Sequence, residues 1–213
     1  MTSRIPQLAR RGRTWLWALP ALAWLLFCAW YTNTSGPLTE DEIAAFTAQA
    51  ERIGRPAEVV QRLRRFMVED TGDQFLMANL IDMADADETA PLSPEASMGR
   101  YMEHMYPELF RRASHPVLAG PVVFPAMDLV GIEGAESWDS FAIMRYRSRR
   151  DLMEIALNPI FDEKHHFKIA ALDKTIAVPV EPQIYLSDPR LLLFLILFFL
   201  VAVADALIFR RDN

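Results

Sequence analysis

The sequence contains one cysteine and four histidines in 213 residues. A single cysteine excludes an internal disulfide, and Cys28 itself lies in an apolar run near the N-terminus. The sequence has no cysteine pair at metal-binding spacing, no glycine-rich phosphate loop, no His-Glu-x-x-His motif and no internal repeat. It also offers no Ser-His-Asp grouping. These absences exclude the metal, nucleotide and hydrolase sites that short motifs mark most clearly.

Two long apolar runs are present, one near each end of the chain. Residues 191–209 include one charge, and a 19-residue helix spans roughly 28 Å, about the thickness of a bilayer core. Residues 15–31 carry aromatic side chains at both ends, as membrane interfaces do. A cleaved signal peptide is the alternative for this run. Because no small-x-small pair follows it and Trp30 occupies the cleavage zone, we favour an uncleaved anchor. The sequence therefore predicts two transmembrane helices.

The charges around these runs predict an orientation. Arginines flank both runs on the side of the chain ends: Arg4, Arg10, Arg11, Arg13, Arg210 and Arg211. Residues 32–189 contain 15 Lys and Arg against 26 Asp and Glu, a net charge of −11. The positive-inside rule then places both termini in the cytoplasm and the acidic middle region outside, in the periplasm of a bacterial inner-membrane protein. A region with this large a negative charge would repel the phosphates of a nucleic acid, which excludes a nucleic-acid partner.

Asp205 is the one ionisable residue within the second run. Carboxylates inside a membrane are functional by default. This one lies five residues before Arg210, so its side chain can reach towards the headgroup region. Pairing of the two helices or a role in proton transfer stays open as the alternative.

The chain between the runs divides into helical and mixed segments. Thr39 and Glu42 form a capping box that opens one amphipathic helix, and Pro56 starts another. These helices either pack on the following domain or carry it away from the membrane. The predicted divisions are a basic tail (1–14), a span (15–31), a linker with amphipathic helices (32–71), a domain (72–181), a linker (182–190), a span (191–209) and a tail (210–213).

The domain at 72–181 alternates between apolar runs of strand length and helical periodicity. The runs "FLMANLIDM", "VLAGPVVFPAMDLV", "WDSFAIMRY" and "TIAVPVE" predict strands, the second broken by prolines, and His115 before it is read as a turn residue. Helices are predicted over 93–113, 148–157 and 158–173. Strand, helix, strand, strand, helix, strand is the βαββαβ order of the ferredoxin-like fold, an α+β class.

Two segments, "RYRSRRDLMEIALNP" and "FDEKHHFKIAALDKTIAVPV", carry a family resemblance. They resemble the family known as domain of unknown function 1330, in the dimeric α+β barrel superfamily. The matching positions are Tyr146, Ser148, Arg149, Asn158, Pro159, Phe161, Lys168, Ala170 and Ala171, with Asn79 in the first strand. The resemblance covers roughly residues 72–181, and the two spans and the helices at 39–69 depart from the usual cytosolic member.

The resemblance implies a homodimer in which two such domains pair sheet to sheet into a barrel. In the superfamily a pocket generally lies between the sheet and the helices of each subunit. Members elsewhere in it include cofactor-free monooxygenases, haem-degrading enzymes, muconolactone isomerases and chlorite dismutases. The resemblance therefore implies a ligand-binding or catalytic role in such a pocket.

The two adjacent histidines diverge by about 100° on a helix, so they do not share a metal ion. His166 falls on a polar stripe and is expected at the surface. His165 falls on an apolar stripe with Phe161 and Ile169, facing the sheet. A packed histidine is the simpler interpretation, while a general base or an axial haem ligand is the functional one. We predict no metal and no cofactor, with haem at His165 as the open alternative.

Two further polar residues are candidates for a pocket. Asn79 alternates with Phe75 and Met77 on one strand face, as either a structural amide or a hydrogen-bond donor to a ligand. Arg145 shares a face with Ile143, and it binds an anionic substrate or, as we favour, makes a surface salt bridge near the strand end.

The residues favour a non-enzymatic role, because no grouping supplies an acid, a base and an activator together. We expect a membrane-anchored module that binds a small ligand or a membrane-protein partner. The alternative is a membrane-tethered monooxygenase or isomerase acting on a hydrophobic small molecule through His165, Asn79 and Arg145. Fold analogy alone supports that class.

Overall fold

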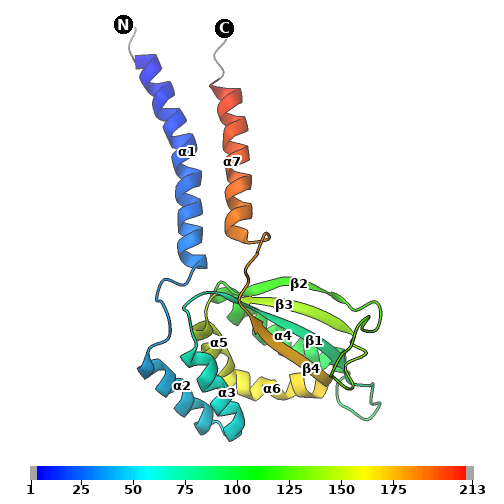
Figure 1. The fold of residues 1–213 in the computed structure, drawn as a ribbon. Helices are drawn as coiled ribbons and strands as arrows, with labels where there is room; N and C mark the ends of the chain where they lie inside the picture. The colour runs from blue at the N-terminus through cyan, green and yellow to red at the C-terminus, as the bar shows by residue number, and fades with distance from the viewer. Residues whose placement is uncertain (1–3, 210–213) are drawn as a thin grey trace. The chain divides into compact units, whose positions relative to one another are not determined.

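The computed structural model describes residues 4–209, and for residues 4–10 and Asp162 it describes the backbone alone. The chain forms two compact units, shown in Figure 1. One unit joins Met1–Thr32 to Gln183–Asn213, and the other is Asn33–Pro182. Each unit is described by itself below.

The first unit is a pair of helices, α1 (Arg4–Tyr31) and α7 (Pro189–Ile208). The stretches Arg11–Tyr31 and Pro189–Ile208 are long and apolar enough to cross a membrane. Their side chains are mostly exposed, unlike those of the core helix of a soluble protein. Pro20 lies inside α1, which begins at Arg4.

Polar and aromatic contacts join α1 and α7 along their length. Arg13 donates from Nε and Nη2 to the two carboxylate oxygens of Asp205, both at 2.7 Å. Towards the other end, Trp24 Nε1 donates to the Arg190 carbonyl at 2.8 Å. The start of α1 thus lies beside the end of α7, so the two helices are antiparallel. Asp205 pairs the helices, which is one of the roles that the sequence left open.

The second unit is built on a four-stranded sheet. Its strands are β1 (Phe75–Met83), β2 (His115–Pro121), β3 (Ser140–Tyr146) and β4 (Leu172–Val180), in the spatial order β2-β3-β1-β4. All neighbouring pairs are antiparallel. Helix α4 (Pro94–Arg111) follows β1, and α5 (Arg149–Ala156) with α6 (Pro159–Ala171) precedes β4. This confirms the ferredoxin-like α+β fold.

Helices cover one face of this sheet, as Figure 1 shows for α4 and α6. Phe75 and Tyr146 project from that face with stacked rings 5.2 Å apart, and Leu109 of α4 packs in the same core with no exposed surface. Ile155 of α5 and Phe161 of α6 complete this core. The helix layer and one sheet face therefore bury a single apolar cluster.

The helices α2 (Glu40–Arg52) and α3 (Ala57–Val68) add a second core. The predicted capping box is confirmed, because Thr39 Oγ1 accepts from Glu42 N while the Glu42 carboxylate accepts from Thr39 N. Val60 and Met67 pack against Met153 of α5. The two amphipathic helices therefore pack on the domain.

Local capping signals explain where the helices of the domain begin. Ser93, Ser148 and Asn158 each accept a backbone N–H at the first turn of α4, α5 and α6. The turn predicted at His115 is wrong, because β2 begins there. Its pairing with β3 shifts register between Pro116 and Leu118, and this irregularity accommodates a proline without a donor N–H.

Candidate functional site

Asn79 lies on the helix-covered face of the sheet and is half-buried. Its Nδ2 donates to the Met77 carbonyl at 2.9 Å and to the Ala142 carbonyl at 3.2 Å. Both amide hydrogens are thus directed at the backbone of β1 and β3. This geometry matches the structural interpretation of Asn79.

Arg145 is fully buried, which makes the favoured surface salt bridge wrong. Its Nε donates to Gln74 Oε1 at 2.8 Å, and its Nη1 donates to the Ala113 carbonyl. Gln74 precedes β1 and Ala113 precedes β2, so the segments that lead into two strands close around the guanidinium group. A run of arginines at a strand end gives no sign of that closure in the sequence.

His165 is half-buried on α6, with its ring 5.5 Å from the ring of Phe161. His166 is exposed, as expected, and its Nδ1 lies 2.8 Å from the Glu163 carbonyl. The expected apolar stripe is wrong at Ile169, which is 61% exposed. Helix α6 packs chiefly against α4, so its buried side is rotated towards Lys168 and Ala171.

The three candidate residues do not form one site. Asn79 is opposite Ala142 in the register of β1 and β3, and Arg145 lies three residues further along β3. Because side chains alternate along a strand, Asn79 and Arg145 project from opposite faces of the sheet. Among the residues that the structure describes, no three His, Cys, Asp or Glu side chains are grouped to hold a metal ion.

The other face of the sheet is mostly apolar. Along β4, Ile176, Val178 and Val180 are 36%, 47% and 44% exposed, and Leu118 on β2 is 56% exposed. We call this surface the open face; its residues are Leu76, Ala78, Leu80, Leu118, Phe141, Ile143, Ile176, Val178 and Val180. In the described residues, neither core cluster includes a side chain of this face.

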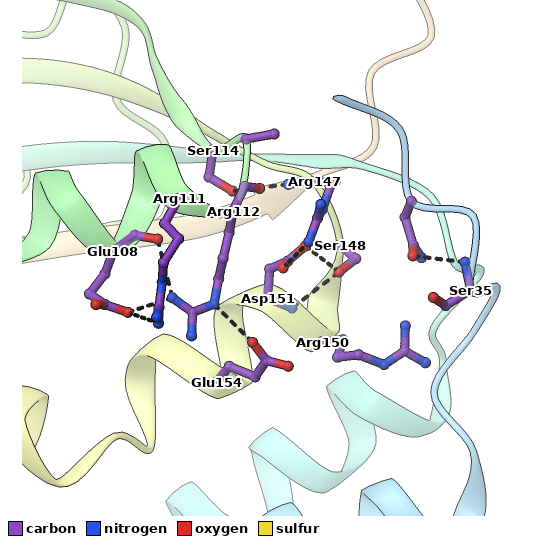
Figure 2. A network of polar contacts seen from close by, with 12 residues as sticks. Ser35, Glu108, Arg111, Arg112, Ser114, Arg147, Ser148, Arg150, Asp151 and Glu154 are labelled. Carbon is purple, nitrogen blue, oxygen red and sulfur yellow. Dashed lines mark hydrogen bonds and ion pairs between the residues drawn. The ribbon is translucent and has the colours of Figure 1, made fainter. Parts of the chain in front are cut away.

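A polar pocket of about 480 Å³ lies at the end of the domain where β3 meets α5. We call it the arginine pocket; its lining residues are Asn33, Ser35, Arg111, Arg112, Arg147, Ser148, Arg150, Asp151 and Glu154. Figure 2 shows how its side chains come together from the end of α4, the start of α5 and the segment before α2. No residue that the sequence singled out as a candidate lines it.

Carboxylates hold the guanidinium groups of this pocket in place. Arg147 donates from Nε and Nη2 to both oxygens of Asp151, at 2.9 and 2.7 Å. Arg112 donates from Nε to Glu154 at 2.9 Å and from Nη1 to Glu108 at 2.5 Å. Although burial raises the pKa of Glu108, the hydrogen bond from Arg112 leaves it below its ordinary value. The network keeps several guanidinium planes oriented around one cavity.

Arg150 connects the pocket to α2. It donates from Nε to Glu42 Oε1 at 2.6 Å and from Nη2 to Glu42 Oε2 at 3.0 Å. The hydrogen bond from Arg150 lowers the pKa of Glu42 from 4.5 to about 2, and the bond from the Thr39 backbone adds to this. Glu42 therefore serves both as the helix cap and as an ion-pair partner.

No family model matches the chain, and no curated protein matches it. Among solved structures, it is similar to a Rhodopseudomonas palustris protein of unknown function, at 21% identity and a TM-score of 0.49, over 62% of this chain and 98% of that one. The methylated form of that protein gives 20% identity and a TM-score of 0.49, over 64% and 97% of the two chains.

A dimeric protein of unknown function with a ferredoxin-like fold, from Bacteroides fragilis, is similar at 11% identity and a TM-score of 0.33. That similarity covers 51% of this chain and 96% of the other. These likenesses are too distant to transfer a family or an activity. The fold of this chain is assigned from its own strand order, β2-β3-β1-β4.

Proposed function

We propose that the protein is a membrane-anchored, non-enzymatic assembly module that dimerises through the open face of its sheet. The observation that carries this proposal is a row of apolar side chains across all four strands, exposed at Leu118 and Val178 on the two edge strands and half-buried on β1 and β3. A contiguous apolar face of a folded domain marks an interaction surface. An ion pair, Lys174 to Asp82 at 3.3 Å, lies at one end of it.

A second copy of the chain is the occupant that this surface fits. Two apolar sheet faces pack against each other at about 10 Å, and an apolar face complements itself without matching charges. The resemblance to the dimeric α+β barrel superfamily implies the same pairing. The apolar face of a ferredoxin-like sheet is thereby removed from water without a further helix layer.

The size of the open face sets the strength expected for this contact. The strands have 7 to 9 residues. At about 3.3 Å per residue and about 4.8 Å between strands, the face measures roughly 25 by 19 Å. That footprint of roughly 500 Å² is smaller than the about 800 Å² per partner of a standard interface. We therefore expect a weak dimer that two membrane spans strengthen by raising the local concentration.

Both spans are proposed to be retained in a bacterial inner membrane, with the termini in the cytoplasm and the domain in the periplasm. The antiparallel arrangement of α1 and α7 supports placing both termini on one side. Reporters fused after Asn213 test this. We expect activity from a cytoplasmic reporter, and activity from a periplasmic one alone would contradict the orientation.

Two adjacent residues of β4 give a matched test of the dimer. Ile176 lies on the open face, whereas Ala177 is exposed on the other side of the same edge strand. We expect Ile176→Glu to convert a dimer into a monomer, as measured by the protein mass in mild detergent, and Ala177→Glu to leave it dimeric. A monomeric wild type, or equal effects of the two substitutions, would overturn the proposal.

The rival function, a membrane-tethered monooxygenase or isomerase, needs His165, Asn79 and Arg145 in one pocket. Asn79 and Arg145 project from opposite faces of the sheet, and each donates to groups of the protein itself. No observation on these side chains favours catalysis over packing. We therefore propose no reaction for this protein.

A further inference from the structure

The arginine pocket contrasts with the domain around it. Residues 32–189 carry a net charge of −11, yet four of their 15 basic side chains line this one cavity of about 480 Å³. Two carboxylates, Asp151 and Glu154, share the lining, and two more, Glu108 and Glu42, pair with its arginines from outside it. A cavity of this volume falls in the range of roughly 300 to 1,000 Å³ that small-molecule sites occupy.

The guanidinium groups are oriented before any ligand arrives. From outside the lining, Glu108 contacts Arg111 at 2.8 Å and Arg112 at 2.5 Å, and Glu42 contacts Arg150 at 2.6 Å. A guanidinium group has five N–H donors. Arg150 also donates to the Gly36 carbonyl at 3.4 Å and the Pro37 carbonyl at 3.1 Å, whereas Arg111 donates to Glu108 through Nη2 and its other donors can bind a second anion. Figure 2 shows the Arg111 and Arg112 side chains next to Glu108, on the side opposite to Ser35.

We propose that the arginine pocket binds a phosphate group, either that of a lipid headgroup or that of a soluble phosphate ester. Planar guanidinium forks match phosphate oxygens in geometry and charge, and several forks around one cavity match a group with several oxygens. Ser35 adds a neutral hydroxyl group to the same lining, whereas Ser148 and Asn33 bond Asp151 and the backbone of Gly36 and Gly72.

The covalent chain limits the distance between one residue of this pocket and the proposed membrane anchor. Ser35 lies four residues after Tyr31, the last residue of α1, so it is within about 14 Å of the end of that helix. Headgroup regions extend several ångströms beyond the bilayer core. The headgroup source rests on the membrane anchoring proposed above, whereas the binding of a soluble phosphate does not.

The binding test uses the full chain in a phosphate-free detergent, with inorganic phosphate as the probe in titration calorimetry. Arg111→Gln removes a lining charge from a side chain that is 64% exposed, and we expect it to weaken phosphate binding about tenfold. Glu154→Gln keeps a hydrogen-bond acceptor for Arg112 but removes a negative charge, and we expect it to strengthen binding. Arg65→Gln on α3, outside the pocket, is the control and should change nothing.

A second arm identifies the source of the phosphate. The same protein in micelles containing phosphatidylglycerol, or diacylglycerol as the phosphate-free match, is assayed for retained lipid by native mass spectrometry. Preferential retention of phosphatidylglycerol that Arg111→Gln abolishes assigns a headgroup, and binding of inorganic phosphate alone assigns a soluble ester. If the protein proves not to be anchored in a membrane, only the lipid experiment loses its basis, and the titration with inorganic phosphate still tests the pocket.

Three outcomes would overturn the proposal. The first is a wild type with no saturable binding of inorganic phosphate or of phosphatidylglycerol. The second is an Arg111→Gln variant that binds as well as the wild type. The third is an Arg65→Gln variant whose binding is weakened as much as that of Arg111→Gln. A purely structural ion-pair network predicts the first of these. Opposite changes in Arg111→Gln and Glu154→Gln are the signature of a phosphate in the cavity.

Discussion

The two faces of the central sheet have similar apolar side chains and opposite surroundings. On the covered face, Phe75 and Tyr146 are 1% and 6% exposed beneath the helices. On the open face, Val178 and Leu118 are 47% and 56% exposed. Strand alternation dictates which residues share a face, but the helix layer decides which face becomes a core. The difference indicates that one face stabilises the monomer and the other is available to a partner.

The largest expected effect is the difference in free energy of unfolding between a substitution in the covered core and one on the open face. Leu109→Ala removes a side chain of α4 with no exposed surface, and we expect it to lower the free energy of unfolding by about 3 kcal/mol. Val178→Ala on the open face should cost the detergent-solubilised monomer less than about 0.5 kcal/mol. Urea unfolding followed by circular dichroism measures both. Equal losses would show that the open face is buried within the monomer.

A smaller effect is expected at Arg145, which is buried although it projects from the same side of β3 as the open face. Arg145 projects from the same face as Ile143, yet it is fully buried and bonded to Gln74 and the Ala113 carbonyl. Because Arg145→Met leaves these two groups without their donor, we expect a loss of about 2 kcal/mol. Arg65→Met, at an 82% exposed side chain, is the control. Matching unfolding midpoints for the two variants would restore the surface interpretation of Arg145.

The smallest effect is expected from the ion pair between Glu42 of α2 and Arg150 of α5. Since the folded-state pKa of Glu42 is about 2 against an ordinary 4.5, its stabilising contribution is complete above about pH 4.5 and is lost as the pH falls towards 2. Glu42→Gln should therefore reduce the loss of thermal stability between these pH values. An identical pH dependence in the wild type and the variant would contradict the ion pair.

The parts of the fold that short-range signals determine were predictable from sequence. Ser93, Ser148 and Asn158 cap their helices through contacts within three residues, and Thr39 with Glu42 forms a capping box within the same range. The order of strands and helices follows from these boundaries and the apolar runs between them. The confirmed ferredoxin-like topology needed no long-range information.

Side-chain environments that depend on distant segments were not predictable. Ile169 was expected to face the core, but α6 packs on α4, so Lys168 lies 5.8 Å from the ring of Tyr101 and burial lowers its pKa. Arg145 is enclosed by residues that precede two other strands. Neither outcome has a local signal, because both depend on which element lies opposite.

The arginine pocket was missed for the same reason. Its lining comes from three separate segments, at 33–35, 111–112 and 147–154. Each basic run resembles an ordinary solvated surface when it is read alone. The only available signal was the density of arginines in "FRRAS" and "RYRSRRD" within an otherwise acidic domain.

The most direct test of the proposed dimer is the labelling rate of a cysteine at Ala78, near the middle of the open face, in a Cys28→Ser background. The protein is reconstituted in liposomes at decreasing protein-to-lipid ratios. We expect the thiol to be protected at high ratios and to react progressively faster on dilution, because the second copy dissociates. A rate that is independent of dilution would contradict coverage of the open face by a second copy.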